Sequence, residues 1–269
     1  LSGREAPETP SFKPSHILYY LGGLTAIGAM TLFMTVGWEQ FGGRGLLLIA
    51  LGYCLVSLLL TEFLLRRRGL LIPAGITAAL AVVMVPLAVY GAQHMMGLWP
   101  ASTEDGAASY RDYHYLIDWR WIVMEAATLV AGVVALWRYG LPFIVLPIAV
   151  TLWYLSMDLT PFLFGGDSVT WYSDRGKLVS IVVGLGMIVA AMLVGLRTRS
   201  ERDFPFWLYV FGVITFWGGL SSLDSDSELN KLIYCGINLL MIAVGAALSR
   251  RGFAIFGAIG VAGYLGHLS

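Results

Sequence analysis

The sequence predicts an all-α protein, a polytopic bundle of about nine transmembrane helices with a cytoplasmic N-terminus. Of the 269 residues, 58% are hydrophobic and only 13% are charged, whereas soluble domains have about 45–50% and about 25%. The mean hydropathy of +0.75 excludes a disordered chain and an ordinary soluble enzyme. The formal net charge is zero, so no overall charge attracts nucleic acid, and we expect no nucleic-acid partner.

Nine apolar runs are long enough to span a bilayer, whose hydrocarbon core of about 30 Å needs about 20 helical residues. They are His16–Gly37, Arg44–Leu65, Leu70–Ala92, Trp119–Trp137, Leu141–Phe164, Lys177–Leu196, Pro205–Leu223, Leu229–Leu248 and Gly252–Leu268. A transmembrane β-barrel would need segments of alternating polarity, which these runs lack. We expect one helical domain over residues 16–268, with a cytoplasmic stub at 1–15 and an outer loop at 93–118. Because the chain opens with Leu1 rather than Met, we also expect a segment upstream of the stub.

Three tight turns between spans carry arginine followed by glycine: Arg67-Arg68-Gly69-Leu70, Arg138-Tyr139-Gly140-Leu141 and Arg250-Arg251-Gly252-Phe253. Glycine just past a helix can adopt the left-handed backbone that ends it. Arginine in the last turn suits the negative end of the helix dipole. We therefore expect antiparallel hairpins from spans two and three, four and five, and eight and nine.

The basic residues predict the orientation of the spans. The turns after spans two, four, six and eight hold Arg66, Arg67, Arg68, Arg138, Arg197, Arg199, Arg202, Arg250 and Arg251. In the opposite turns, acidic residues such as Glu104, Asp105 and Asp167 accompany the basic ones. Loops rich in arginine face the cytoplasm. We therefore expect the N-terminus inside and, with nine spans, the C-terminus outside.

Four polar residues inside the predicted spans form a candidate intramembrane site: Glu125, Asp158, Lys231 and Asn238. Polar and ionisable groups are costly in a membrane and point to function. Glu125 and Asp158 fall in the outer half of one hairpin, while Lys231 and Asn238 share a face of span eight. They predict a polar pocket open to the outside that would bind a proton, a cation or a polar solute. The alternative is a structural set of buried ion pairs and side chains that reach the interface.

Two further patterns concern packing between helices. Ala254, Ala258, Ala262 and Gly266 recur every four residues on span nine, and small residues let helices approach closely in lipid. This stripe predicts tight packing, either inside the chain or against another subunit; Ala74 and Ala78 form a similar pair. Glu62 stands four residues before Arg66, so we expect an ion pair on one helix face.

Motifs for enzymatic chemistry are absent from the sequence, which contains no H-E-x-x-H, no G-x-S-x-G and no Walker A motif. His94, His114 and His267 should all lie outside, but their spacing does not predict a metal site. We expect no metal and no cofactor. The missing motifs argue against an enzyme, and an enzyme without a known signature stays an alternative. Cys54 and Cys235 lie in apolar runs and are interpreted as packing residues.

Three sequence features carry a resemblance to known proteins. They are the glycine-rich first hairpin (Leu21-Gly22-Gly23, Gly28 and Trp38), the Arg-Arg-Arg-Gly turn, and the run from Phe206-Trp207-Leu208-Tyr209 to Phe216-Trp217-Gly218-Gly219. In these features the chain resembles bacterial inner-membrane families known only as domains of unknown function. The resemblance implies a multi-pass protein of the bacterial inner membrane and a soluble N-terminal portion, but no functional residue.

Two functions suit these observations. The first is a structural or accessory subunit of a membrane assembly, in contact with lipid and with other membrane subunits or further copies of itself. It is indicated by the small-residue stripe and by the lack of a catalytic motif. The alternative is a secondary transporter or permease for a small solute, ion or lipid, which is indicated by Glu125, Asp158 and Lys231.

Overall fold

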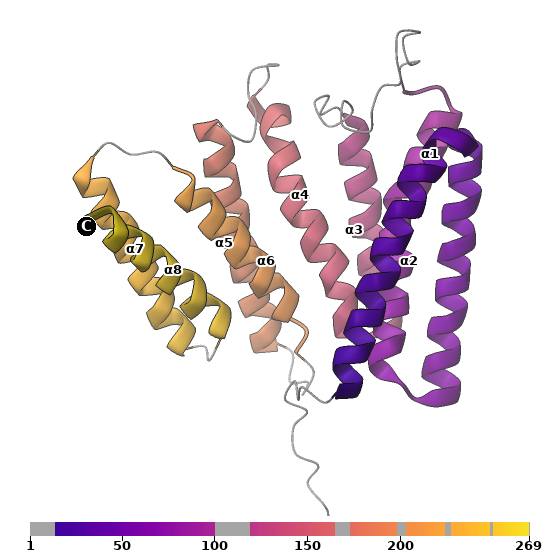
Figure 1. Cartoon of the computed structure of the whole chain (residues 1–269), viewed down its shortest axis with the longest axis horizontal. Coiled ribbons are helices and arrows are strands. Elements are labelled where there is room, and N and C mark those ends of the chain that lie inside the picture. Colours follow the sequence, from indigo (N-terminus) through magenta and orange to yellow (C-terminus); the bar gives the residue numbers. More distant parts are fainter. Residues whose placement is uncertain are drawn as a thin grey trace, which may run out of the picture. The chain divides into compact units, whose positions relative to one another are not determined.

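The computed structural model describes residues 14–99, 119–164, 173–197, 203–223, 227–247 and 250–268, and every regular element within them is helical (Figure 1). In chain order the elements are α1 (Pro14–Phe63), the π-helical turn η1 (Leu64–Arg68), α2 (Leu71–Met95), α3 (Trp119–Tyr139), the 3-10 turn η3 (Pro142–Ile144), α4 (Val145–Phe164), α5 (Asp174–Arg197), α6 (Phe206–Ser221), α7 (Glu228–Ala247) and α8 (Arg251–Leu268). The predicted all-α class is confirmed. Most of the expected stub at 1–15 and of the expected outer loop at 93–118 lies outside the described residues.

The first element, α1, consists of two helices that meet at a kink. Gly42 has a φ of 60° and a ψ of −176°, a backbone conformation that glycine adopts readily because it has no Cβ. The kink falls between the first two predicted spans, His16–Gly37 and Arg44–Leu65. The interval between these spans is therefore a glycine kink rather than a loop.

Six segments within the described residues are long and apolar enough to cross a membrane. They are Gly42–Arg68, Leu71–Met95, Trp119–Tyr139, Pro142–Pro161, Asp174–Arg197 and Glu228–Ala247. Two further apolar helices, Phe206–Ser221 and Arg251–Gly266, are shorter. The six segments indicate a multi-pass membrane protein, while the sequence predicted about nine spans.

Two of the three predicted turn glycines have the expected conformation. Gly69 has a φ of 63° and Gly140 a φ of 59°, and the Gly140 N–H donates to the Leu136 carbonyl at 2.8 Å. The prediction was wrong for Gly252, which lies inside the first turn of α8. There, Arg251 already begins the helix, so the reversal of the chain comes before the glycine.

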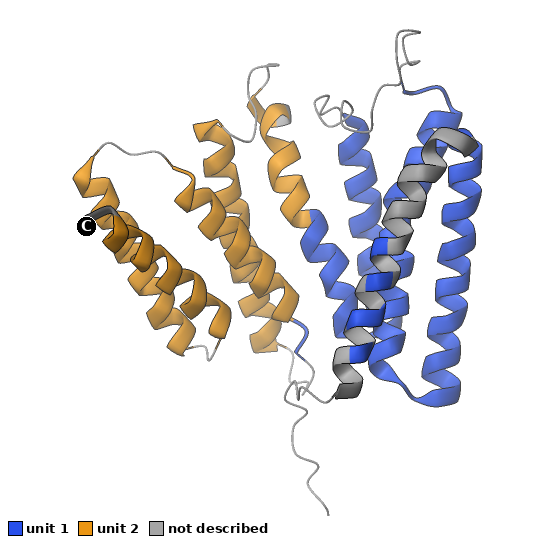
Figure 2. Ribbon diagram, in the orientation of Figure 1, with its two compact units in different colours: residues 1–151, 198–204 blue, residues 152–197, 205–269 orange. Residues whose placement is uncertain are grey.

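The described helices divide into two compact units, coloured separately in Figure 2. Unit 1 comprises Leu1–Thr151 and Thr198–Phe204, and unit 2 comprises Leu152–Arg197 and Pro205–Ser269. The division falls within α4. The sequence showed no boundary inside residues 16–268, because the apolar character of the chain does not change at this point.

In unit 1, helices approach closely where the side chains are small. A Cβ built on Gly91 of α2 would lie 2.7 Å from the backbone nitrogen of Leu47 in α1, and one built on Gly132 of α3 would lie 2.6 Å from Ile148. Ala74 and Ala78 are fully buried, at 0% exposure. Small residues thus bring the helices into contact, as expected in lipid, where little hydrophobic force drives helices together.

Unit 2 contains, besides the second part of α4, two helix pairs that are also in close contact at glycines. Between α5 and α6, a Cβ on Gly184 would overlap the backbone of Phe216, and one on Gly219 would lie 2.9 Å from the Lys177 carbonyl oxygen. Between α7 and α8, a Cβ on Gly257 would lie 2.6 Å from the Asn238 carbonyl oxygen. The buried apolar residues around these pairs are Ala191, Tyr209, Val213, Met241 and Phe253.

Candidate functional site

Asn238 of α7, in unit 2, is a fully buried polar residue with 0% exposure. Its Nδ2 donates to the Tyr234 carbonyl at 2.9 Å, one turn earlier in α7, and its Oδ1 accepts a hydrogen bond from the Trp217 indole of α6 at 3.2 Å. The backbone of α8 comes so close at Gly260 that a Cβ there would overlap the Asn238 amide. Asn238 therefore joins three helices, α6, α7 and α8.

The remaining members of the predicted polar set lie in three different surroundings. Lys231, two turns before Asn238 in α7, pairs through Nζ with Glu228 Oε1 at 2.8 Å. Asp158 is half-buried in the part of α4 that belongs to unit 2. Glu125 is buried in α3 of unit 1, at 8% exposure. The contacts of Lys231 and Asn238 described above thus lie within unit 2, and Glu125 belongs to the other unit.

A buried glutamine links the end of α2 to the start of α3. The Gln93 side chain is 3% exposed; its Nε2 donates to the Arg120 carbonyl at 3.2 Å, and its Oε1 accepts from the Trp99 indole at 3.2 Å. The Arg120 guanidinium stands over the Trp99 ring at 5.4 Å, a cation–π geometry, and the Tyr90 ring lies 4.9 Å from the same ring. This polar and aromatic cluster holds Trp99, which lies just past the turn that ends α2, against α2 and α3.

Sequence reasoning missed Gln93 because the third span was ended at Ala92, which placed the glutamine in the outer loop. The helix continues to Met95. An amide side chain directly after an apolar run of membrane length could have indicated a buried hydrogen-bonding residue, since buried polar side chains in a membrane must find partners. The nearby Trp99 and Trp119–Trp121 were a second signal.

Arg66, at the start of the arginine turn (residues 66–71, between α1 and α2), forms the ion pair with Glu62 of α1 that the sequence predicted. Arg66 Nε lies 2.6 Å from Glu62 Oε2, and Arg138 Nη2 of α3 lies 3.0 Å from Glu62 Oε1. Glu62 therefore binds two arginines from separate helices, and the second partner was not foreseen. A groove of about 280 Å³ at this turn is lined by Glu62, Phe63, Arg66 and Arg67.

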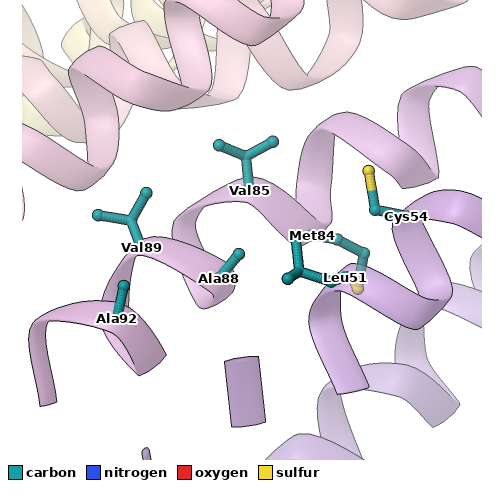
Figure 3. A pocket seen from close by; sticks show the side chains of 7 residues that line it. All are labelled: Leu51, Cys54, Met84, Val85, Ala88, Val89 and Ala92. Carbon is teal, nitrogen blue, oxygen red and sulfur yellow. The ribbon is translucent and has the colours of Figure 1, made fainter. Parts of the chain in front are cut away.

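An apolar pocket of about 290 Å³ lies between the second half of α1 and α2 (Figure 3). It is lined by Leu51, Cys54, Met84, Val85, Ala88, Val89 and Ala92. These side chains offer a hydrocarbon surface and one thiol. Leu51 is 51% exposed, so the pocket is an open depression in the apolar surface of unit 1. Its lining suits a hydrocarbon group rather than a polar solute.

Most of the small-residue stripe on α8 lies away from α7. Gly257 and Gly260, both buried, meet α7, and the backbone nitrogen of Ala254 would lie 2.8 Å from a Cβ built on Gly245 of α7. Ala258, Ala262 and Gly266 of the stripe are exposed, and Ala254 is half-buried. The helix therefore carries two series of small residues, one packed within unit 2 and one on its surface.

Metal ligands do not gather in the part of the chain that the structure describes, where no group of three His, Cys, Asp or Glu side chains could hold an ion. Of the three histidines considered for a metal site, His94 is exposed near the end of α2, His114 lies outside the described residues, and nothing is described of the His267 side chain. Cys54 and Cys235 are free thiols, both half-buried, in keeping with their interpretation as packing residues.

The best-defined polar contacts thus connect helices to one another. Asn238 joins α6 to α7, Gln93 joins α2 to α3, and Glu62 joins the end of α1 to α3. Such contacts hold helices in register without a need for a ligand. Compared with protein-family models, with curated proteins and with solved structures, the chain has no match.

Proposed function

We propose that this multi-pass membrane protein is a structural or accessory subunit of an assembly in the bacterial inner membrane. The supporting observation is the second small-residue series of α8, in which Ala258 and Ala262 are exposed while Gly257 and Gly260 already face α7. Because close approach of small residues drives helix association in lipid, an exposed series suits a further helix. We propose that this helix belongs to another membrane subunit or to a second copy of this chain.

Purification under mild conditions tests this proposal. The tagged chain, extracted in a mild detergent, should bring down one stoichiometric partner, and leucine at Ala258 and Ala262 should reduce that partner at least severalfold because the two side chains would hold the helices apart. The control places the same substitutions at Ala190 and Ala243, which are also exposed in unit 2. Unchanged recovery of the partner with the Ala258→Leu, Ala262→Leu chain would show that the stripe faces lipid.

The alternative function is secondary transport of a small solute, ion or lipid. It is favoured by the buried carboxyl group of Glu125 in α3 and by the half-buried Asp158 in α4, since ionisable groups in spans often form proton or ion pathways. The same purification separates the two functions. A chain that comes out alone, with no second copy and no partner, would favour the transporter.

We further propose about nine spans with a cytoplasmic N-terminus and arginine-bearing turns on the cytoplasmic side. The Glu62–Arg138 ion pair supports this orientation, because it brings the turn after α1 and the turn after α3 to the same end of unit 1. In unit 2, the Arg250 guanidinium lies 5.1 Å over the ring of Tyr209, near the start of α6. Turns of like charge at one end are what the positive-inside rule requires.

Cysteine labelling in intact cells tests the orientation at the two ends of α2. This helix has 25 residues, about 37 Å, so its ends should reach opposite faces of the bilayer. In a chain without Cys54 and Cys235, Met96→Cys should react with an impermeant thiol reagent added outside, and Arg67→Cys should react only after the cells are opened. Labelling of Arg67→Cys in intact cells would reverse the proposed orientation.

A further inference from the structure

The arginine turn has a strong local excess of positive charge. The turn itself holds Arg66, Arg67 and Arg68, and Glu62 brings Arg138 of α3 to it. These four guanidinium groups and the one carboxylate of Glu62 sum to a net charge of +3. The Glu62 carboxylate forms ion pairs with Arg66 and Arg138. In the described part of the chain neither Arg67 nor Arg68 has an ion pair, and both are exposed.

The backbone at this turn does not cancel that charge. The carbonyl oxygen of Leu64 accepts the N–H groups of Gly69 and Leu70, which closes the C-terminal end of the helical run, and α2 begins at Leu71. A helix C-terminus carries about half a negative charge and a helix N-terminus about half a positive charge. The two helix ends offset each other here, so the arginine side chains decide the sign of the potential.

Apolar side chains flank the same turn. Phe63 is 49% exposed, Leu70 40% and Leu71 42%, and the turn ends one candidate membrane segment and begins the next. The groove of about 280 Å³ between Glu62, Phe63, Arg66 and Arg67 brings apolar and cationic groups together. A ligand that fits this surface has an anionic head and hydrocarbon chains.

We propose that the arginine turn binds the phosphate of an anionic phospholipid, with Arg67 and Arg68 holding the headgroup and the exposed apolar side chains contacting the acyl chains. Arginine guanidinium groups bind phosphate oxygens through paired hydrogen bonds. Glu62 limits the number of arginines that the lipid can bind by holding Arg66 and Arg138 to the protein. The proposal is independent of the subunit function, because it concerns the bilayer rather than a protein partner.

Native mass spectrometry of the purified full chain tests the site. The protein in dodecyl maltoside is mixed with equal amounts of phosphatidylglycerol and phosphatidylcholine, and the bound lipids are counted. The wild-type chain should prefer phosphatidylglycerol, and the Arg67→Gln, Arg68→Gln variant should lose about tenfold or more of that preference, since each arginine near an anionic headgroup contributes measurably to binding. An excess of inorganic phosphate should not displace the lipid.

The control removes two exposed arginines elsewhere, Arg44→Gln at the other end of the α1 segment and Arg175→Gln in α5, and should keep the preference. Three outcomes would overturn the proposal. One is an unchanged preference in the Arg67→Gln, Arg68→Gln variant. The second is an equal loss in the control, which would indicate general charge attraction. The third is displacement by inorganic phosphate, which would indicate an anion site that does not need lipid.

Discussion

Replacing Gly184 by alanine should destabilise the protein by about 3 kcal/mol, the upper end of what overpacking usually costs. The added Cβ would overlap the backbone of Phe216 in α6, and a backbone cannot rotate away as a side chain can. The two helices would have to separate along their contact, where Gly212 and Gly219 also lie close to α5. Loss of the monodisperse species after heating in detergent, followed by size-exclusion chromatography, measures this change.

Gly186, two residues further along α5, provides the matched control. It is exposed, with nothing within 4 Å of a Cβ built on it. Alanine there should leave stability unchanged or raise it by about 0.5–1 kcal/mol, because glycine is a poor helix former. Equal stabilities of the Gly184→Ala and Gly186→Ala proteins would contradict the close approach of α5 and α6.

Replacing Asn238 by leucine should cost about 2–3 kcal/mol. The change removes both side-chain hydrogen bonds and leaves the half-buried Trp217 indole N–H without its acceptor, a loss of about 1–3 kcal/mol. The backbone of α8 at Gly260 also leaves no room for a branched side chain to move. The stability of the purified protein to heat and denaturant reports this loss, and Asn230→Leu, at an exposed position in the first turn of α7, should change stability by less than about 0.5 kcal/mol.

A double-mutant cycle isolates the hydrogen bond itself. Trp217→Phe removes the indole N–H and should cost about 1 kcal/mol, close to what interhelical hydrogen bonds contribute in membranes. When Asn238→Leu and Trp217→Phe are combined, the loss should be smaller than the sum of the single losses, because one contact cannot be lost twice. Strict additivity would mean that the two side chains do not interact.

The helices were predictable because each apolar run has an obvious length and the ends are marked by arginine, glycine and proline. The sequence did not predict which face of each helix packs against other helices and which faces lipid. In a soluble protein the polar side of a helix shows which side is buried, but lipid is as apolar as a protein core, so the pattern is lost. On α8 the sequence contains two small-residue series, and nothing in the spacing distinguishes the glycines that meet α7 from the exposed Ala258 and Ala262.

In the candidate site, contacts within one helix could be predicted from the sequence, and contacts between helices could not. Glu62 and Arg66 were predicted to pair because helix geometry alone places residues four apart side by side. Trp217 and Arg138 could not be assigned as partners, since they reach Asn238 and Glu62 from other helices. The proximity of Glu125 to Asp158 stays a prediction: the two residues fall in different units, and the division between these units occurs within one continuous apolar helix.

The glycine contacts also affect the order of assembly during synthesis. The closest backbone approaches join helices that follow one another in the chain, α1 with α2, α5 with α6, and α7 with α8. Such local contacts form quickly, because only a short loop has to close. Each pair can therefore dock as soon as its second helix has left the ribosome and entered the bilayer. A polypeptide built in this way exposes a single unpartnered helix to lipid only briefly, while the rest of the chain is still being translated.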